Sequence, residues 1–575
     1  MLDLVLRGGT VIDGSGRPRR VADVAVDNGM IVDVDRITDS ARRSVDVSGL
    51  VVGPGVIDVH THYDAQLFWD PAATPSCFHG VTTVLGGNCG FTLAPFAGGD
   101  YLMRLMSRVE GIPLAALEAG VPWNWTSFRE YLDRLDGQIA LNAGFMCGHS
   151  TLRHHAMGSS AVERTATPDE LAAMVAALHD ALDAGALGFS SSDTVNHNDG
   201  DGRPVPSRAA NDEERLALAS AVAAHPGTSL EWILTGVLHG FSDHDVDLLT
   251  SLSLAANRPI NWNALGVVSS DPEGHWQRLQ ASTTAATRGA TVVALAVPDA
   301  VTARLSFIHG FILDGLPGWN PVLSLPPDER RRALADPEVR RRLAAGAASP
   351  DAGLLRDLVD WDHITVSQTY CDANKSAEGK TGGQLAHERG MSALDAILDV
   401  VVADDLRTGL DTAAMGNDQE TWRMRAETWS DPRVLVGGSD AGAHVDIMCG
   451  AVTSTVHLGL NVRERQLLTL EDAVRQLTDM PARLYGLRGR GRVAPGYHAD
   501  LMVFDADRVG PGPVRTRNDL PAGAARLVAE AIGVAHVFVN GTEVVTDGRL
   551  TGDSPGTLLR SGRDTYTVEA GTYAP

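Results

Sequence analysis

The chain has 575 residues, more than one hydrophobic core usually serves, so we expect two domains or one large decorated domain. Hydrophobic residues make up 44% of it and charged residues 21%, which is the composition of a folded globular protein rather than a disordered one. A formal net charge of -24 argues against a nucleic-acid partner, because phosphate binding needs basic stripes and the sequence contains none.

No targeting or membrane segment is visible in the sequence. The first residues, MLDLVLRGGTVIDGSG, lack a basic leader followed by a long apolar stretch, so we expect no signal peptide. No run of about 18 apolar residues occurs, so we expect no membrane span. The five cysteines are odd in number and widely scattered, which is typical of the reducing cytoplasm and leaves a metal or catalytic role for one of them.

The two ends of the chain share a β-rich pattern. Residues 1–53 alternate short period-two apolar segments with Gly-rich turns, which predicts a small antiparallel sheet. The same style returns at residues 485–552, where Asn540 and Gly541 form a hairpin signal. We expect both segments to pair into one small β-sandwich that brackets the middle of the chain, and residues 553–575 to form an extended tail.

Between these segments, residues 54–484 alternate strand-like and helix-like stretches. Ser127, Thr167 and Asn211 each predict a helix start, because a side-chain oxygen there can cap the first turn. Eight apolar segments have strand character: VIDVH, VTTVLGG, IALNAGFMCG, ALGFSSS, TSLEWILTG, RPINWNALG, ATVVALAVP and RVLVGGSD. Such repeats favour an α/β fold with a TIM-like (β/α)8 barrel over a doubly wound sheet, which the alternation alone does not exclude.

A long insertion at about 300–430 separates the last two strand candidates. It contains the charged segment DERRRALADPEVRRRL, which we interpret as one helix. Because the segment is too long for a simple connection, we expect it to cover the pocket as a lid.

The sharpest motif is VIDVHTH at residues 56–62. Residues two apart in a strand point to the same face, so the imidazoles of His60 and His62 project together and can chelate one ion. They follow the first barrel strand, at the carboxyl end where barrel enzymes hold their chemistry. A bare HxH is often a coincidence, but its position after PGVID favours a metal site.

Two further segments end strands with side chains suited to metal chemistry. Cys89 follows VTTVLGG, and its thiolate can bind Zn²⁺, although a small buried cysteine explains the pattern equally well. Asp440 leaves an apolar strand into the Gly-rich loop GSDAGAH, which suits a metal ligand or general base but also a helix cap. His444 in the same loop is either part of a polar pocket or an ordinary loop histidine.

Together these segments resemble the amidohydrolase superfamily and, more narrowly, its D-aminoacylase (N-acyl-D-amino-acid deacylase) family. The resemblance covers nearly the whole chain. Its most specific parts are GVIDVHTHYD, GVTTVLGGNCGFTLAPF, GHSTLRHHAMG, ATPDEL, ALDAGALGFS, SDAGAH, MPARLYGL and GRVAPGYHADLMVFD. The family's fold implies a barrel joined to a sandwich built from both chain ends.

The resemblance implies a metal site and a hydrolytic mechanism. It assigns metal ligation to His60, His62, Cys89 and Asp440, with one Zn²⁺ per chain favoured because one complete ligand set is visible. The implied reaction is metal-assisted hydrolysis, in which Asp440 accepts a proton from water and returns it to the departing nitrogen. His149 and His444 are candidate substrate-binding residues that help to stabilise the oxyanion, and a structural loop histidine is the alternative for each.

The chain departs from the family pattern at several positions. Relatives carry two further histidine ligands on strands five and six, where this sequence has Glu231 and Asn261. Glu231 can act as a substitute oxygen ligand, so a second metal site stays open. A lysine that meets the substrate carboxylate in relatives corresponds to Asn263, and no Lys or Arg occurs between Asp440 and Arg463. No lysine lies near ALGFSSS, which excludes the carboxylated lysine that bridges two metals in other members.

These observations predict a cytoplasmic, metal-dependent hydrolase of a non-peptide C–N bond in a small-molecule amide, similar to N-acyl-amino-acid deacylases. Opening of a cyclic amide such as a hydantoin or lactam is one alternative, which the SDAGAH loop and a roomy lid do not exclude. A metal- or ligand-binding protein that has lost catalysis is another; the missing histidines favour it, whereas the set His60, His62 and Asp440 opposes it. The substrate's acyl and amine parts, its stereochemistry and the oligomeric state stay open.

Overall fold

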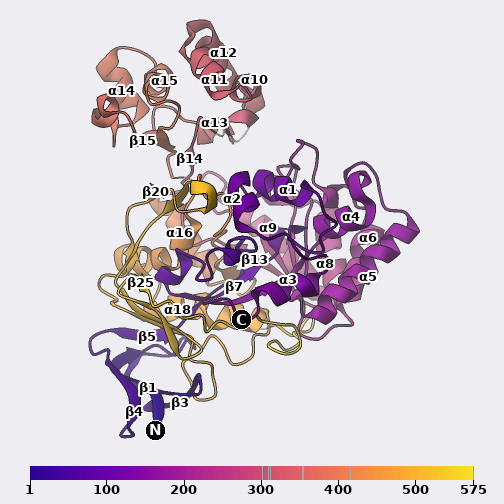
Figure 1. Cartoon of the computed structure of the whole chain (residues 1–575), viewed down its shortest axis with the longest axis vertical. Coiled ribbons are helices and arrows are strands. Elements are labelled where there is room, and N and C mark those ends of the chain that lie inside the picture. Colours follow the sequence, from indigo (N-terminus) through magenta and orange to yellow (C-terminus); the bar gives the residue numbers. More distant parts are fainter. Residues whose placement is uncertain (301, 309, 311, 353–354, 415, 574–575) are drawn as a thin grey trace. The chain divides into compact units, whose positions relative to one another are not determined.

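The computed structural model describes residues 1–575 except 301, 309, 311, 353–354, 415 and 574–575. The chain divides into two compact units (Figure 1). The barrel unit comprises Met1–Asp299, Gln419–Val445 and Cys449–Pro575, and the inserted unit comprises Ala300–Asp418 and Asp446–Met448.

Eight parallel strands form the centre of the barrel unit. In chain order they are β6 (Val56–Asp58), β7 (Val81–Gly86), β8 (Asn142–Phe145) with its continuation β9 (Cys147–Gly148), β10 (Gly188–Ser192), β11 (Ser229–Ile233), β12 (Ile260–Asn263), β13 (Val292–Ala296) and β17 (Val434–Val436). A parallel bridge between Thr61 and Ala441 joins the chain after β6 to the chain after β17 and closes the circle. The expected (β/α)8 barrel is confirmed.

The capping residues expected from the sequence start three helices of this unit. Ser127 accepts the backbone N–H of Glu130 at α3 (Phe128–Leu135), and Thr167 caps α5 (Pro168–Ala184) in the same way. Asn211 caps α6 (Asp212–Val222). Further helices of the unit are α1 (Tyr101–Val109), α2 (Leu114–Gly120), α4 (His149–Met157), α7 (Gly236–His239), α8 (Asp243–Ala256), α9 (Gly274–Thr287), α16 (Gln419–Trp429), α17 (Thr453–Thr455), α18 (Leu470–Leu477) and α19 (Asp479–Leu484).

Strands from both chain ends form one nine-stranded sheet in the order β25-β24-β23-β18-β5-β1-β2-β3, with β4 beside β1. Their bounds are β1 (Leu2–Val11), β2 (Arg20–Asp27), β3 (Met30–Asp35), β4 (Ala41–Asp46), β5 (Val51–Pro54), β18 (Leu501–Phe504), β23 (Val534–Val539), β24 (Thr542–Thr546) and β25 (Arg549–Leu550). Buried Leu6, Val24, Leu501 and Phe538 share one core. The expected small β-domain from both chain ends is confirmed, with its strands hydrogen-bonded into a single sheet.

Four short strands complete the carboxyl-terminal β segment: β19 (Gly510–Pro511) with β22 (Ala531–Ile532), and β20 (Arg515–Arg517) with β21 (Arg526–Val528). The hairpin expected at Asn540 and Gly541 joins β23 to β24. Both hairpin residues have positive φ, 47° and 79°, which suits asparagine followed by glycine.

The last residues of the chain are packed rather than merely extended. The N–H of Gly556 donates to Ile139 O at 2.9 Å, and the N–H of Leu559 donates to Ala143 O at 2.7 Å. Further along, the N–H of Ser561 donates to the carbonyl of Gly185, just before β10. The tail therefore runs along the amino-terminal ends of barrel strands, and Leu559 is buried in a core with apolar side chains of those strands.

The inserted unit has its own sheet and core. Its antiparallel strands lie in the order β14 (Arg304–Leu305), β16 (Gly409–Asp411), β15 (Thr365–Gln368). Its helices are α10 (Asn320–Leu323), α11 (Pro327–Ala335), α12 (Pro337–Ala347), α13 (Leu355–Leu358), α14 (Gly382–Arg389) and α15 (Ala393–Ala403). The single charged helix expected here is wrong: Asp336 leaves the helical conformation and caps α12, where Pro337 occupies the first position.

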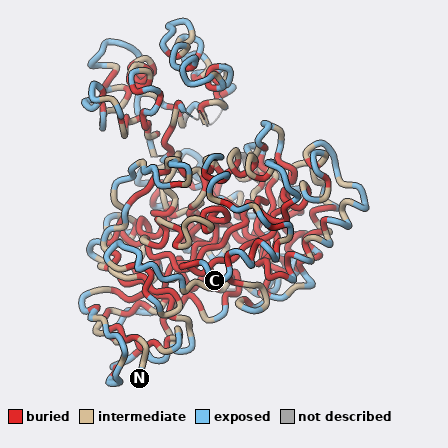
Figure 2. The backbone as a smooth tube through the Cα atoms, in the orientation of Figure 1, coloured by how far each residue is buried: buried red, intermediate tan, exposed pale blue. Residues whose placement is uncertain are grey.

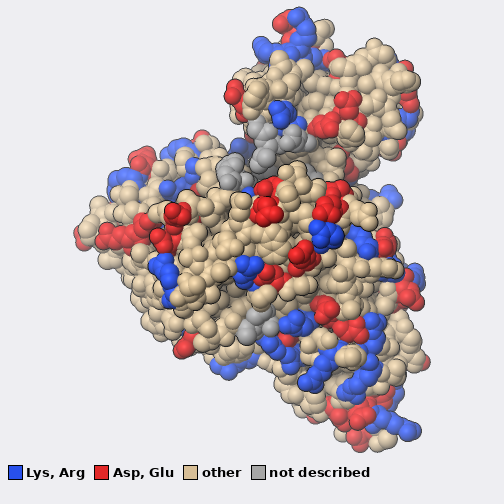
Figure 3. Space-filling view, turned by 180° about the vertical axis from the view of Figure 1, so that it is seen from behind, with Lys and Arg blue, Asp and Glu red and all other residues tan. Residues whose placement is uncertain are grey.

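Buried residues gather around the strands of each compact unit. Figure 2 shows buried residues concentrated in the barrel strands and in the sheet, with exposed residues on the outer turns. On the face drawn in Figure 3, acidic and basic side chains are interspersed in small groups. Among the described residues, none of the helices combines the length and apolar character needed to cross a bilayer.

Candidate active site

Two histidines and an aspartate meet at the carboxyl end of the barrel. His60 and His62 follow β6, and their rings lie edge to face with centroids 5.3 Å apart. His62 Nε2 lies 3.0 Å from Asp440 Oδ1, and His60 Nε2 lies 3.6 Å from the same oxygen. Both imidazoles are buried, whereas the Asp440 side chain is 30% exposed. The carboxylate therefore borders the histidine pair and also faces open space.

Cys89, which follows β7, joins this group. Its Sγ lies 3.4 Å from His60 Nε2. Within the described part of the chain, ligand atoms of His60, His62 and Cys89 all lie within 4.8 Å of one another. Two imidazole nitrogens, a thiol sulfur and the neighbouring Asp440 oxygen are donors that Zn²⁺ prefers. The residues therefore fit a single zinc ion in both chemistry and convergence.

The turn that carries Cys89 is held by neighbouring strands. Cys89 has φ 42°, a left-handed conformation that costs free energy for a residue with a Cβ. Ser190 Oγ, on β10, donates to Gly87 O at 2.5 Å and accepts the N–H of Gly90 at 3.1 Å. Asn88 Nδ2 donates to the Leu85 carbonyl at 3.0 Å. These bonds on either side of Cys89 hold the thiol toward His60.

The loop after β17 is tied directly to β6. Asp440 has φ 58°, and its N–H donates to the His60 carbonyl at 3.0 Å. The N–H of His62 donates to Ala441 O at 2.8 Å. Beneath them the buried Asp58 carboxylate accepts the N–H of Ser439 at 3.2 Å. Because these backbone hydrogen bonds join the segment after β6 to the loop after β17, the backbone sets the distance between the imidazoles and Asp440.

Burial and mutual charge shift the acid–base behaviour of these groups. Burial lowers the pKa of His60 to about 4, so its imidazole is neutral and able to accept a cation. Burial alone would raise the pKa of Asp440, but the hydrogen bond and charge of His62 outweigh it and hold that pKa below its usual range. Asp440 is therefore an anion near neutral pH.

Glu110 is a site residue that the sequence did not reveal. It directly follows α1, is 3% exposed, and its Oε2 lies 3.3 Å from His62 Nδ1. Burial raises the pKa of Glu110 to about 8. Burial alone would lower the pKa of His62, but the charge of Glu110 and the hydrogen bond to Asp440 outweigh it and raise that pKa to about 10. The only signal in the sequence is one acid in the otherwise apolar segment VEGIP.

Glu231 on β11, the fifth barrel strand, and Asn261 and Asn263 on β12, the sixth, have different partners. Glu231, at β11, is fully buried and accepts a hydrogen bond from Asn263 Nδ2 at the end of β12. Asn261, expected at the second ligand position, instead donates to Val293 O at 3.0 Å and lies 3.4 Å from Tyr485 Oη. Asn263, expected to correspond to a substrate-binding lysine, thus takes the place beside Glu231. Burial raises the pKa of Glu231 to about 8.

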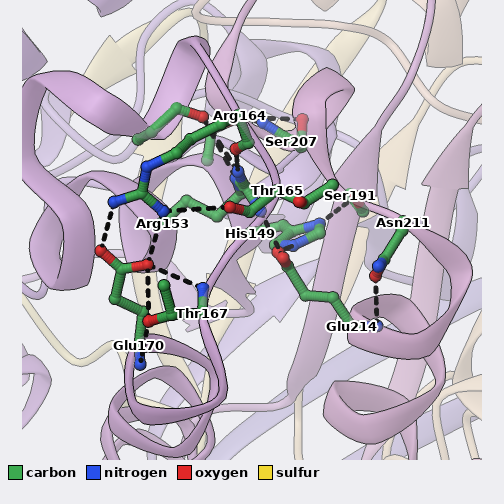
Figure 4. Close-up of polar contacts among 12 residues, drawn as sticks. His149, Arg153, Arg164, Thr165, Thr167, Glu170, Ser191, Ser207, Asn211 and Glu214 are labelled. Carbon is green, nitrogen blue, oxygen red and sulfur yellow. Dashed lines mark hydrogen bonds and ion pairs between the residues drawn. The ribbon is translucent and has the colours of Figure 1, made fainter.

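His149 lies in a closed polar network (Figure 4). Its Nδ1 hydrogen-bonds Ser191 Oγ and its Nε2 hydrogen-bonds Glu214 Oε1, both at 2.8 Å. Arg153 donates to the other oxygen of Glu214, and all four side chains are buried. Both ring nitrogens are therefore used, and the geometry argues against the expected role in substrate binding. The alternative of a structural histidine fits, with side-chain partners rather than backbone.

His444 lies at the open side of the site. Its Nε2 is 3.9 Å from Asp440 Oδ2, and its side chain is 23% exposed. The backbone N–H of His444 donates to the Glu110 carbonyl at 2.5 Å, and its φ is 48°. Gly111 has φ 62°, and a Cβ there would come within 3.1 Å of His444 Cα, so a side chain at this position would be strained. His444 can therefore meet a substrate bound against Asp440.

The profile of the Amidohydrolase family matches residues 43–316 and 333–545. This chain belongs to the amidohydrolase family. A curated relative, D-aminoacylase from Alcaligenes xylosoxydans xylosoxydans, is 30% identical over 561 residues, which cover 97% of both chains. This amidohydrolase is thus a member of the D-aminoacylase group, and it is a hydrolase of C–N bonds other than peptide bonds.

Two solved structures resemble this amidohydrolase over their whole length. A D-aminoacylase with a binuclear metal center, characterised by one-metal activation and second-metal attenuation, is 28% identical with a TM-score of 0.65 and covers 97% of this chain and 100% of its own. N-acyl-D-glutamate deacylase from Bordetella bronchiseptica, with zinc and a phosphonate inhibitor, is 25% identical with a TM-score of 0.65 and the same coverage. Both likenesses span the barrel and the β-domain.

Proposed function

We propose that this amidohydrolase is a metal-dependent deacylase that hydrolyses the amide bond of an N-acylated small molecule, with Asp440 as general base. The observation that carries the proposal is the convergence of His60, His62 and Cys89 within 4.8 Å, with Asp440 Oδ1 at 3.0 Å from His62 Nε2. The names of its relatives, D-aminoacylase and N-acyl-D-glutamate deacylase, supply the substrate class.

His60, His62, Cys89 and Asp440 would hold one zinc ion, which when bound supplies a Lewis acid for water and for the substrate carbonyl. Asp440 accepts a proton from the attacking water as the new C–O bond forms. It then returns that proton to the nitrogen as the C–N bond breaks, so that a carboxylic acid and an amine leave. His444, beside Asp440, donates a hydrogen bond to the oxyanion in this scheme.

The test of the proposal is hydrolysis of N-acyl amino acids and neutral secondary amides with and without a chelator. We expect turnover that is lost on chelation and restored by Zn²⁺. Turnover that survives complete removal of metal would contradict the proposal. Lactams and hydantoins belong in the same panel, because their opening uses the same groups and is the alternative reaction.

We expect about one tightly bound metal ion per chain. Within the described part of the chain, one group of converging ligand residues is found, His60, His62 and Cys89, with Asp440 Oδ1 beside His62. At the neighbouring position, Glu231 Oε1 already accepts a hydrogen bond from the Asn263 amide. Elemental analysis of protein purified without added metal measures this directly. Two equivalents would contradict the expectation and would make Glu231 a ligand; Glu231→Gln would then remove only the second equivalent.

Free N-acyl-D-amino acids are expected to be poorer substrates than their neutral derivatives. The family resemblance implies a cation for the substrate carboxylate at the position of Asn263, and no Lys or Arg occurs between Asp440 and Arg463. Without a charge-assisted partner, a buried carboxylate costs about 100-fold or more in kcat/KM.

The measurement compares kcat/KM for N-acetyl-D-amino acids with their amides and esters, so that each pair differs only in the blocked carboxylate. A clear preference for the free carboxylates would contradict the expectation, and would require a cation beyond the residues described around the site.

A further inference from the structure

We propose that Glu110 is a positioning residue, which orients the imidazole of His62 so that its Nε2 faces the metal. This inference rests on the metal site of the proposed function. Glu110 touches neither Asp440 nor Cys89 by a described hydrogen bond or ion pair; its described side-chain partner is His62, at 3.3 Å from Oε2 to Nδ1. Its effect on the reaction therefore passes through that ring.

The two nitrogens of His62 face different partners. Nε2 lies 3.0 Å from Asp440 Oδ1, on the side of His60 and Cys89, whereas Nδ1 lies toward Glu110. A histidine that binds an ion through Nε2 must carry its proton on Nδ1 and needs an acceptor there. Glu110 is the carboxylate in that position, so it selects the tautomer that leaves the Nε2 lone pair for the ion.

The contact between His62 and Glu110 matters because both side chains are buried. His62 is 1% exposed and Glu110 is 3% exposed. Among the described residues, neither His62 Nδ1 nor Glu110 Oε1 has a partner in full hydrogen-bond geometry. Water cannot replace the lost interaction for groups this deeply buried, so each depends on the other.

The backbone around Glu110 fixes the carboxylate in place. Its carbonyl accepts the N–H of His444 at 2.5 Å, and its N–H donates to Met106 O at 3.0 Å at the end of α1. Through this residue the end of α1, the histidine after β6 and the loop after β17 are joined. A residue that only filled space would need no carboxylate at this junction.

The experiment measures Zn²⁺ affinity by competition with a chelating dye, and records the absorption spectrum of the Co²⁺-substituted protein. The variants are Glu110→Ala and Glu110→Gln in the full chain, with Glu118→Ala, an exposed glutamate on α2, as the matched control. Circular dichroism and Tm of the metal-free proteins verify folding. His60→Ala provides the reference for loss of a direct ligand.

We expect Glu110→Ala to bind Zn²⁺ about 10- to 100-fold more weakly and to alter the Co²⁺ spectrum. Glu110→Gln keeps an oxygen for the Nδ1 proton but not its charge, so its affinity should fall by a smaller factor, and Glu118→Ala should match the wild type. If Glu110→Ala does not fold, the Glu110→Gln affinity and spectrum decide.

Wild-type affinity and spectrum in the folded Glu110 variants would overturn the proposal. A loss as complete as in His60→Ala would also overturn it, because Glu110 would then be a direct ligand. A wild-type protein that binds no Zn²⁺ would contradict the proposed function itself, whereas equal binding by wild type and variants would contradict only the role of Glu110.

Discussion

Replacement of Asp440 by asparagine is expected to lower kcat by about 10²- to 10⁴-fold, because the amide cannot accept a proton from water. The fold should survive, since asparagine tolerates the left-handed backbone that Asp440 adopts at φ 58°. The Asp440 N–H would still donate to the His60 carbonyl. Steady-state kinetics on the best substrate of the panel, together with Tm, measure both effects.

Asp547→Asn is the matched control for this substitution. Asp547 also has a positive φ, 47°, but lies exposed in the β-domain. It should keep both kcat and Tm. Wild-type kcat in Asp440→Asn would mean that another group accepts the proton, and the assigned mechanism would be wrong.

The double substitution His60→Ala with His62→Ala is expected to abolish metal binding as well as turnover. Two of the converging donors disappear, and Cys89 with Asp440 cannot hold Zn²⁺ alone in a four-coordinate site. Metal content after dialysis should fall from about one ion per chain to near zero. Added Zn²⁺ should raise the Tm of the wild type but not of the variant, because only a bound ion stabilises the folded state.

Two exposed histidines, His244 and His363, supply the control, since their side chains are 61% and 71% exposed. The double variant His244→Ala with His363→Ala should keep its metal and its activity. Retention of a full metal equivalent in the His60 and His62 variant would refute the assigned ligand set.

The barrel could be predicted because its signals are local. Each strand is a short apolar run between turn residues, and helix starts such as Ser127 and Thr167 carry their caps within four residues. The break between α11 and α12 had an equally local signal in Asp336 and Pro337, which the high density of charged residues obscured. Secondary structure that depends only on neighbouring residues can therefore be predicted from the sequence.

The candidate site could be predicted from the sequence only where a strand end carries its own signature. His60 and His62 share a face by the period of two, and the structure brings Cys89 beside them. By the same period, Asn261 and Asn263 point to the same face of β12. Their height along the barrel axis differs, however, and it is Asn263 that contacts Glu231. Which residues of neighbouring strands lie at the same height depends on how the strands are staggered, and the sequence of a single strand does not determine that stagger.

Glu110 and His149 mark the limit of that reasoning. Glu110 reaches His62 from the end of a helix, and nothing in the helix pattern indicates which distant ring it meets. The sequence likewise could not reveal that Ser191 and Glu214 enclose His149. Such contacts depend on packing of elements that are remote in the chain.

The sheet that joins both chain ends has a consequence for synthesis on the ribosome. Strand β5 pairs on one side with β1, which belongs to the same amino-terminal segment, but its other partner is β18. That partner follows roughly 450 residues later, about 20 to 90 s at the usual rate of translation. During this interval the nascent chain carries an unpaired strand edge, which can pair with other chains. Pairing of β5 with β18 therefore has to wait until the whole barrel has been translated.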